Sequence, residues 1–481
     1  MRKLAIFRLC IVFPGFFSLA MIFPLVIALA FGEYRMAFAF GVTIGASAAV
    51  AVPAFALGGR PAPGFNTREG ILFVCFAWFS ACLLGAVPYY LSGYFPGFSD
   101  ALFECVSGLT TTGITVLPDL EALPYSLHFW RAMTLWLGGM GTVVFAAGLA
   151  SRLGAGGVRP LQETAGRTEE RFAPGPGGAA KILCLVYCAL TAVLFLLFFA
   201  GGMGWFDALF HALSAVSTGG FSTRNNGIAA FNSPYLEWVC AVFMLIAGFN
   251  FTLICRLARG KFRDIADNDE AKAYFAIILV SALVVGVSIL PEAGSVEKAL
   301  RRAFFGVVSV MTTTGLRAED PGLWPPLAQM VVFMLMFTGG CSGSAAGGIK
   351  VIRHVVLFKQ AKNETMRLLY PSGVFSLQLD KKPCEKHVVY NVAAFLFLYF
   401  LLLCLGTLLM GVSAGAGLFD SVNASAIALG NIGHGLGDRL PGGLFQQAPD
   451  YVKWGFSFLM IAGRLELFTV LILFAPGFWR G

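Results

Sequence analysis

Hydrophobic residues form long stretches along nearly the whole chain, and polar residues gather in short segments between them. Several stretches contain about 20 residues, the length with which a helix crosses the hydrocarbon core of a bilayer. The first two lie near residues 11–31 and 36–58. The first is too long for the apolar part of a signal peptide, and further spans follow it. The pattern therefore predicts an all-α polytopic membrane protein.

From residue 70 onward, one order of elements occurs four times: a full span, a short apolar segment, a phrase rich in Thr, Ser and Gly, and a second span. The short segments have too few residues to cross a bilayer, which predicts re-entrant half-helices that enter from outside. They lie near residues 99–109, 206–216, 297–311 and 417–429. The paired full spans lie near residues 70–92 and 128–150, 181–201 and 235–255, 273–290 and 325–358, and 387–411 and 451–475.

The order of elements predicts a division into two N-terminal transmembrane helices and four pore repeats. The helices occupy residues 1–69, and the repeats occupy residues 70–180, 181–272, 273–386 and 387–481. Two full spans per repeat is an even number, so every repeat inserts in the same orientation. Such repeats can surround one pore in a pseudo-fourfold arrangement, whereas inverted repeats around a midplane site would need an odd number. The count argues against an alternating-access transporter.

The phrase that follows each half-helix suits a loop that presents its backbone to an ion. The four phrases are TTTGI at Thr110–Ile114, STGGF at Ser217–Phe221, TTTGL at Thr312–Leu316 and the diverged NIGHG at Asn431–Gly435. Non-helical backbone at membrane depth survives only where it is buried or faces a water-filled cavity. Small side chains leave room for carbonyl oxygens, and glycine tolerates the required backbone angles. We therefore expect a carbonyl-lined filter for an alkali cation, with close helix packing of small residues as the alternative.

The composition supports a membrane protein, and the charge distribution predicts its orientation. Of the 481 residues, 57% are hydrophobic and 12% are charged, against about 25% charged residues in soluble domains. The net charge of +8 comes from residues spread between spans, which argues against a nucleic-acid partner. Lys and Arg concentrate on the cytoplasmic side of membrane proteins, which places both termini in the cytoplasm. The basic residues assigned to that side are Arg2, Lys3, Arg8, Arg60, Arg68, Arg152, Arg159, Arg167, Arg171, Lys181, Arg256, Arg259, Lys261, Arg263, Lys272, those from Lys350 to Lys386, and Arg480.

Other kinds of site find little support in the residues. The 11 cysteines form no CxxC pair or Cys/His cluster of metal spacing, and no catalytic triad or HExxH pattern is present, so an enzyme is not expected. The glycine-rich stretch 339–350 is not a nucleotide-binding loop, because Ile349 separates Gly348 from Lys350. The phrases contain no acidic ring, which disfavours a pore for divalent cations. Asp100, Asp207 and Asp420 are interpreted as caps of the half-helices, with an additional role in concentrating cations at the pore mouth as the alternative.

Four features together resemble the TrkH-type potassium transporters of the Trk/Ktr/HKT superfamily over essentially the whole chain. They are the phrases, GGMGTVVFAAGL at Gly138–Leu149, TGGCSGSAAGGIKVIR at Thr338–Arg353, and IAGRLELFTVLILF at Ile461–Phe474. The resemblance implies four repeats around one pore, a homodimer, and potassium uptake across the bacterial cytoplasmic (inner) membrane. It also implies a cytosolic nucleotide-binding ring of the TrkA or KtrA type that regulates the pore.

The same resemblance assigns the residues of a potassium filter. Its glycines fall on Gly113, Gly220, Gly315 and Gly433, and the other coordinating carbonyls fall on Thr111, Thr112, Thr218, Gly219, Thr313, Thr314, Asn431 and Ile432. Relatives that pass sodium can have Ser at the position of Gly113, so the glycine favours potassium. His434 stands where the family usually has proline. A titrating His434 that alters conductance and a merely hydrogen-bonded one are both open.

A gate is implied beneath the filter. Five glycines would interrupt the second span of the third repeat, namely Gly339, Gly340, Gly343, Gly347 and Gly348. The broken piece resembles the family's intramembrane gating loop. Plain helix flexibility is the alternative. Arg464 lies in an apolar span, where an ionised group normally faces a partner or a water-filled path. We expect it to repel cations below the filter, with structural pairing as the alternative.

The expected function is potassium uptake through this channel-like pore. A symporter that couples potassium to protons or sodium is an alternative, although no proton-relay carboxylate is evident in the sequence. A sodium-permeable channel of the same fold is a second alternative. The cytosolic loops are too short for a nucleotide-binding domain, so no nucleotide is expected to bind this chain.

Overall fold

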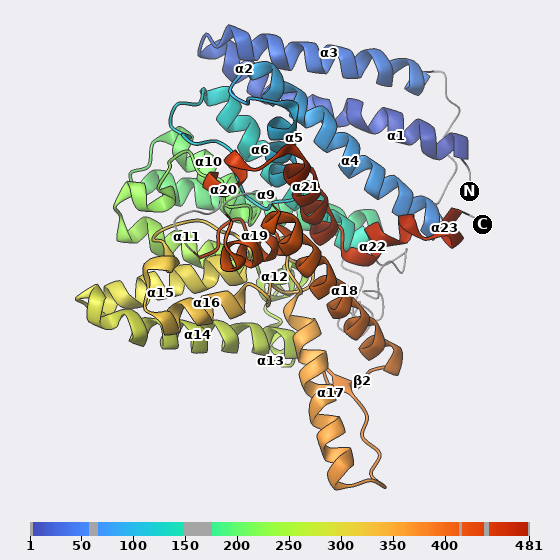
Figure 1. Ribbon diagram of the computed structural model, residues 1–481, viewed down its shortest axis with the longest axis vertical. Helices are drawn as coiled ribbons and strands as arrows, with labels where there is room; N and C mark the ends of the chain where they lie inside the picture. Colours follow the sequence, from blue (N-terminus) through green and yellow to red (C-terminus); the bar gives the residue numbers. More distant parts are fainter. Residues whose placement is uncertain (1–2, 57–65, 149–175, 413–415, 437–441, 480–481) are drawn as a thin grey trace.

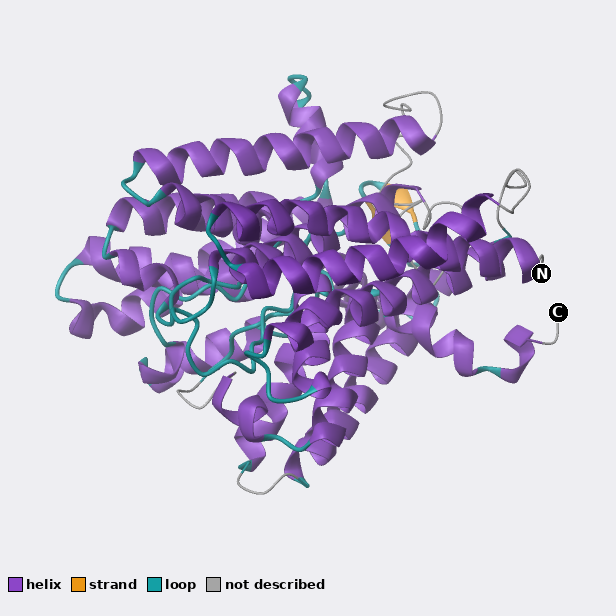
Figure 2. Ribbon diagram, turned by 90° about the horizontal axis from the view of Figure 1, so that it is seen from above, coloured by secondary structure: helices purple, strands orange, loops and turns teal. Residues whose placement is uncertain are grey.

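The protein is described from a computed structural model that covers residues 3–56, 66–148, 176–412, 416–436 and 442–479 (Figure 1). Helices dominate this part of the chain, as Figure 2 shows from above. By length and composition, six of its helices could cross a membrane, or up to eight if each of two bent pairs is one span. The predicted all-α polytopic membrane fold is confirmed. Of the basic residues assigned to the cytoplasmic side, Arg2, Arg60, Arg152, Arg159, Arg167, Arg171 and Arg480 lie outside the described residues.

The N-terminal helices pack against the first repeat. They are α1 (Lys3–Ser18), the short η1 (Leu19–Met21), α2 (Ile22–Ala30) and α3 (Tyr34–Ala56). Ser47 donates a hydrogen bond to Ser18 across the helix pair at 2.6 Å. Between α2 and α3, the Glu33 carboxylate accepts the backbone N–H groups of Tyr125 and Ser126. Because these are free donors at the start of a later helix, Glu33 ties the N-terminal unit to the first repeat.

Each repeat has the predicted order of a long helix, a half-helix and a second span. The first spans are α4 (Thr67–Ser92), α9 (Pro176–Ala200), α14 (Asp269–Ala293) and α18 (Lys386–Gly411). The half-helices are α5 (Phe98–Leu109), α10 (Trp205–Val216), α15 (Val296–Met311) and α19 (Leu418–Gly430). The second spans are α6 (Tyr125–Gly148), α11 with α12 (Pro234–Ala247 and Phe251–Ala258), α16 with α17 (Pro326–Leu335 and Val351–Leu369), and α21 with α22 (Asp450–Arg464 and Leu467–Leu471).

Short elements complete the described chain. They are η3 (Gly227–Phe231), α13 (Phe262–Ala266), η4 (Pro321–Leu323), β1 (Gln378–Leu379), β2 (Lys382–Pro383), α20 (Gly442–Gln447), η5 (Ile472–Phe474) and α23 (Pro476–Trp479). Phe478 of α23 packs against Ile71 near the start of α4. The end of the described chain therefore lies beside the start of the first repeat.

Two spans predicted as continuous are bent, and those predictions are wrong. The chain bends by 103° between α11 and α12, and by 118° between α21 and the helical segment Leu467–Phe474. At the first bend, the Asn250 side chain accepts the N–H groups of Thr252 and Leu253 and begins a new helix. At the second bend, Glu466 has a positive φ of 67°. The interruption predicted in the third repeat is observed, because α16 ends at Leu335 and α17 begins at Val351.

The half-helices pack against the preceding repeat in a cyclic order. The half-helix α10 contacts α6, α15 contacts α11, and α5 contacts α21 of the last repeat. At the remaining junction, the rings of Phe333 on α16 and Phe419 on α19 lie 5.8 Å apart. Every repeat thus contacts the next and the fourth contacts the first, as expected for repeats around an axis.

The helix α17 and the strand pair protrude from the rest of the molecule (Figure 1). Asp269 at the start of α14 accepts hydrogen bonds from Lys359 of α17 and from the backbone N–H of Asp380 in the hairpin turn. Lys381 donates to Asp267, and this hydrogen bond lowers the pKa of the Asp267 carboxyl. Carboxylates near α14 therefore hold the hairpin in place.

Replacing Asp269 with alanine should release the hairpin, because the substitution removes an acceptor shared by Lys359 and Asp380. Limited trypsin digestion of the purified protein should cleave residues 370–385 several times faster. The midpoint of thermal unfolding should change little, because the membrane-embedded contacts remain. Glu364→Ala, which removes exposed contacts with Gln360 and Arg367 on α17 itself, is the matched control. Equal cleavage rates in wild type and Asp269→Ala would contradict this role.

Candidate functional site

The four loops after the half-helices share one unusual backbone conformation. Thr111, Thr218, Thr313 and Asn431 have φ values of 52°, 55°, 56° and 53°. Two residues later, Gly113, Gly220, Gly315 and Gly433 have φ values of 80°, 76°, 69° and 82°. A left-handed conformation costs a non-glycine residue about 1–2 kcal/mol. Its occurrence at the same position in all four loops indicates a common geometric requirement.

Hydrogen bonds turn the loop N–H groups back toward their own half-helices. The N–H of Thr112 donates to Ser107 O at 2.8 Å, and that of Gly219 donates to Ser214 O at 3.0 Å. The corresponding bonds are Thr314 to Ser309 O at 2.9 Å and Ile432 to Ile427 O at 3.0 Å. Because these donors are satisfied within each repeat, the carbonyl groups are left to face other partners.

The four loops contact one another in a closed ring. A Cβ atom added to Gly113 would clash with the carbonyl oxygen of Gly219 in the next repeat. In the same way, Gly220 lies against Thr314 O, Gly315 against Ile432 O, and Gly433 against Thr112 O. Each clash is far inside van der Waals contact, so only glycine fits. The structure thereby brings together all twelve loop residues named from the sequence, namely Thr111, Thr112, Gly113, Thr218, Gly219, Gly220, Thr313, Thr314, Gly315, Asn431, Ile432 and Gly433.

The fourth loop differs from the other three in its side chains. Asn431 donates hydrogen bonds from Nδ2 to Thr112 Oγ1 and to Met460 O, each at 2.9 Å. An amide side chain therefore connects the last repeat to the first. Nε2 of His434 is buried and has no hydrogen-bond partner among the described residues. The hydrogen-bonded interpretation of His434 finds no support at this atom.

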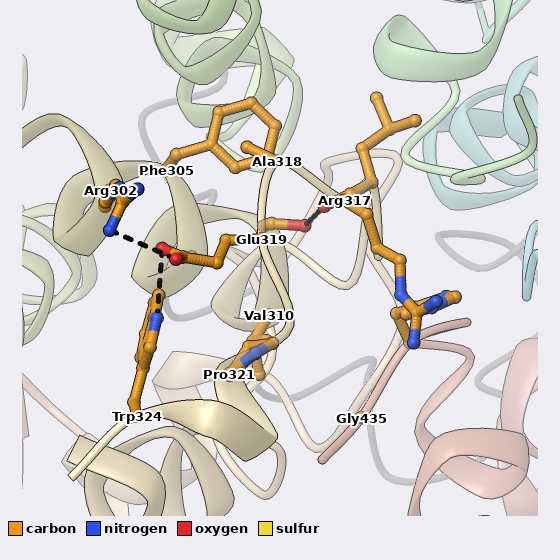
Figure 3. Close-up of a pocket in the computed structure, with 13 residues that line it drawn as sticks. Arg302, Phe305, Val310, Arg317, Ala318, Glu319, Pro321, Trp324 and Gly435 are labelled. Carbon is orange, nitrogen blue, oxygen red and sulfur yellow. Dashed lines mark hydrogen bonds and ion pairs between the residues drawn. The ribbon is translucent and has the colours of Figure 1, made fainter. Parts of the chain in front are cut away.

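A small hollow lies beside the junction of the third and fourth loops (Figure 3). In Figure 3, Glu319 forms an ion pair with Arg302 at 3.1 Å and accepts a hydrogen bond from the indole N–H of Trp324 at 3.2 Å. Gly306 and His434 also line this space. The hollow thus lies among residues of the third repeat and of the fourth loop.

The glycine-rich segment 336–350 contacts the loops from one side of the ring. Gly347 donates its N–H to Thr313 Oγ1 at 2.7 Å, and a Cβ on Gly347 would lie 2.7 Å from Gly430 O. Positive φ values of 75°, 75° and 76° occur at Gly339, Gly343 and Gly348. A Cβ on Gly340 would lie 2.9 Å from Gly248 O. The segment is folded against both the loops and the bend of the second repeat.

Arg464 holds this segment from another repeat. Its Nη1 donates to Ala345 O at 2.8 Å, and its Nη2 lies 3.5 Å from Gly138 O. Arg464 is buried and ends α21, so its predicted place within a continuous span is wrong. The predicted gating residues and Arg464 are therefore adjacent.

Several buried charge pairs escaped the sequence prediction. Arg131 and Glu104 are fully buried and lie 2.9 Å apart, and the Nζ of Lys453 lies 2.6 Å from Asp100. Glu466 pairs with Arg353 at 2.5 Å. Ionised residues inside apolar segments were the signal that could have identified these groups. Their pairing depends on residues from distant parts of the chain.

The interpretation of three acidic residues as helix caps is wrong. The N-cap positions of α5, α10 and α19 are Gly97, Gly204 and Gly417, without a capping side chain. The acidic residues Asp100, Asp207 and Asp420 lie three positions later, still within the positive end of each helix dipole. Asp207 instead accepts hydrogen bonds from Thr223 and Arg224.

Comparisons with known proteins agree over nearly the full length. The family model "TrkH: Cation transport protein" matches residues 43–480. The "Trk system potassium uptake protein TrkH" of Halomonas elongata is 35% identical over 474 residues, which cover 96% of each chain. The TrkG protein of Escherichia coli, named for the same uptake system, is 32% identical and also covers 96% of each chain. The crystal structure of the potassium transporter TrkH from Vibrio parahaemolyticus superimposes with a TM-score of 0.89, at 31% identity and 100% coverage of both chains.

Alanine at Gly220 tests the interlocked ring. The substitution combines a positive φ with a clash against Thr314 O, so the free energy of unfolding should fall by about 2 kcal/mol or more. The measurement is the thermal unfolding midpoint in detergent. Gly41→Ala is the control, because a Cβ there meets nothing within 4 Å, and helical alanine is favoured over glycine. Equal midpoints for the two variants would contradict the ring geometry.

Proposed function

The chain belongs to the TrkH family of cation transport proteins, and we propose that it takes up potassium across the cytoplasmic membrane of a bacterium through the ring of four loops. The observation that supports this most is the conformation shared by the four loops. Each loop has a left-handed residue followed two positions later by a glycine, and that glycine lies against a carbonyl of the next loop. The resemblance noted from the sequence is thereby confirmed at the level of the family. Potassium binding by the twelve loop residues remains a proposal.

Carbonyl oxygens suit a monovalent cation that gives up its water readily. Neutral carbonyls replace the hydration shell of potassium in known filters, whereas acidic rings are typical of other cation pores. At the ring, the carbonyls of Thr112, Gly219, Thr314 and Ile432 each face a glycine of a neighbouring repeat. Hydrogen bonds between threonine hydroxyls support two of the loops. The Oγ1 atoms of Thr110 and Thr112 lie 2.7 Å apart, as do those of Thr312 and Thr314. The site is therefore proposed to favour potassium over sodium.

The segment 336–350 and Arg464 are proposed to form the gate. The segment is attached to the loops by the hydrogen bond from Gly347 to Thr313 and to Arg464 through Ala345 O. A guanidinium near the cation path would act as a barrier, because two like charges about 6 Å apart repel by about 3 kcal/mol at an effective dielectric constant of about 20. Opening would require the segment and the guanidinium to move apart.

We propose that the pore works in an assembly within the lipid bilayer. Exposed apolar side chains on the first spans, such as Leu196, Val287 and Phe397, suit contact with lipid. From the family resemblance, the assembly is a homodimer with a cytosolic nucleotide-binding ring of the TrkA or KtrA type. The division into repeats at residues 70–180, 181–272, 273–386 and 387–481 and the cytoplasmic position of both termini belong to the same proposal.

A second candidate function is uptake coupled to protons. The observation that favours it is Glu270, which is buried near the start of α14 and accepts the N–H of Ser342 in the segment 336–350 at 2.6 Å. A buried carboxylate against a moving segment has the chemistry of a proton relay. Glu270 was not identified from the sequence, because it lies beside charged residues at the end of an apolar stretch.

Reversal potentials of the purified full-length protein in liposomes distinguish these functions. Under opposed potassium and sodium gradients, the reversal potential should follow the potassium gradient alone. An imposed pH gradient should leave it unchanged if the pore is a channel. A shift with the pH gradient would support the coupled alternative, and equal permeability for sodium would refute the proposed selectivity.

Substitution of Arg464 with methionine should increase basal potassium flux about tenfold or more. The change removes a buried positive charge and its hydrogen bond to Ala345 O, and methionine fills the site with an unbranched apolar side chain. Tracer uptake into liposomes without any regulatory protein gives the measurement. Arg35→Met is the control, because Arg35 lies on α3 and bonds to Leu91 O far from the ring. An unchanged or lower flux with normal insertion would argue against the barrier.

A further inference from the structure

A fully buried ion pair lies directly behind the first loop. Glu104 of α5 and Arg131 of α6 both have side chains with no exposed surface, and Nε of Arg131 donates to Glu104 Oε1 at 2.9 Å. The same carboxylate accepts the hydroxyl of Thr115 at 3.0 Å and the N–H of Val116 at 3.1 Å. Thr115 and Val116 continue the chain just after Gly113. Glu104 thus fixes the outer end of the first loop.

The guanidinium of Arg131 also contacts the second loop. It stacks over the ring of Phe221 with 4.1 Å between the guanidinium carbon and the ring centroid. Its Nη1 donates to Ser222 O at 3.3 Å. Phe221 and Ser222 come directly after Gly220. One planar group therefore touches the residues that follow two neighbouring loops.

Hydrogen bonds extend this cluster into the second half-helix. Nδ1 of His211 donates to Asp207 O at 2.7 Å, so Nε2 of the neutral ring accepts from the Ser222 hydroxyl at 2.9 Å. A continuous buried path runs from Asp207 through His211, Ser222 and Arg131 to Glu104. Its members all come from the first two repeats.

The other two repeats have no counterpart to these side chains. Nine residues before each glycine, the first two repeats have Glu104 and His211, whereas the others have Gly306 and Ala424. The position of Gly306 borders the hollow at the third and fourth loops. Among the described residues, the side chains at this position therefore link neighbouring loops by charge and hydrogen bonds only in the first two repeats.

We propose that Arg131 is a positioning residue that sets the cation selectivity of the ring by fixing the spacing between the first and second loops. The guanidinium is suited to this because its rigid fork can stack on one side and donate in two directions, which an ammonium group cannot do. Glu104 neutralises the charge and orients the fork. The inference rests on the proposed potassium-conducting function.

Three full-length proteins in liposomes test this role: wild type, Arg131→Lys and Thr115→Val. Lysine retains a positive charge beside Glu104 but loses the planar fork, and valine removes one hydroxyl from the Glu104 carboxylate at nearly constant volume. The sodium-to-potassium permeability ratio from reversal potentials should rise about fivefold or more in Arg131→Lys and less in Thr115→Val. The tracer flux of potassium should persist in both.

Arg301→Lys is the matched control. Arg301 is a mostly buried arginine of α15 that pairs with Glu237 of α11 and with Glu297 of its own helix. Both of these partners lie outside the loops, so the permeability ratio of Arg301→Lys should equal that of wild type. A rise in the control equal to that in Arg131→Lys would overturn the assignment to Arg131.

The remaining outcomes separate positioning from plain stability. A wild-type permeability ratio in both Arg131→Lys and Thr115→Val would overturn the proposal, as would a loss of flux with an unchanged ratio. If Arg131→Lys does not reach the membrane in folded form, the ratio of Thr115→Val decides alone. A wild-type protein that conducts sodium and potassium equally would refute the proposed function and leave no selectivity for Arg131 to set.

Discussion

The constraint on which the structure depends is the presence of polar backbone without helical hydrogen bonds at the depth of a membrane. Such backbone is stable only when its donors and acceptors are satisfied by protein or by the contents of a cavity. Here each loop returns its N–H groups to the end of its own half-helix. The carbonyl groups are left without these partners, and the left-handed residue and the glycine of each loop permit that arrangement. The half-helices, their surrounding spans and the buried ion pairs all maintain it.

Much of the fold could be predicted because length and composition determine whether a helix crosses a bilayer. The short half-helices were recognisable since a segment such as 206–216 cannot span the membrane. The bends after Ala247 and Arg464 were not recognisable, because single polar residues such as Asn250 and Glu466 interrupt otherwise apolar stretches without a helix-breaking proline. One local and one tertiary contact accompany them: the Asn250 side chain caps the new helix α12, and Glu466 pairs with Arg353. Such contacts leave no periodic pattern in the sequence.

The candidate site was predictable to a similar extent. Repeated phrases located all four loops, even the diverged one at Asn431, since glycine and small polar residues recur at one place in each repeat. The residues behind the loops were missed. Glu104 and Arg131 stand 27 positions apart in apolar helices, and neither position reveals that the two side chains meet. The role of Asn431 as a link to Thr112 was hidden for the same reason, because an amide has no fixed partner until the chain is folded.

The head-to-tail contacts between glycines and carbonyls have a consequence for loop grafting. Each glycine fits against the carbonyl of the following repeat, so a loop is complementary to its successor and not to itself. Moving a single loop into another repeat would disrupt two glycine–carbonyl contacts at once, one with the preceding loop and one with the following loop. The smallest exchangeable module is therefore a joint, which consists of one glycine and the carbonyl that faces it. A chimera assembled from joints would preserve the fit that a chimera assembled from loops would lose.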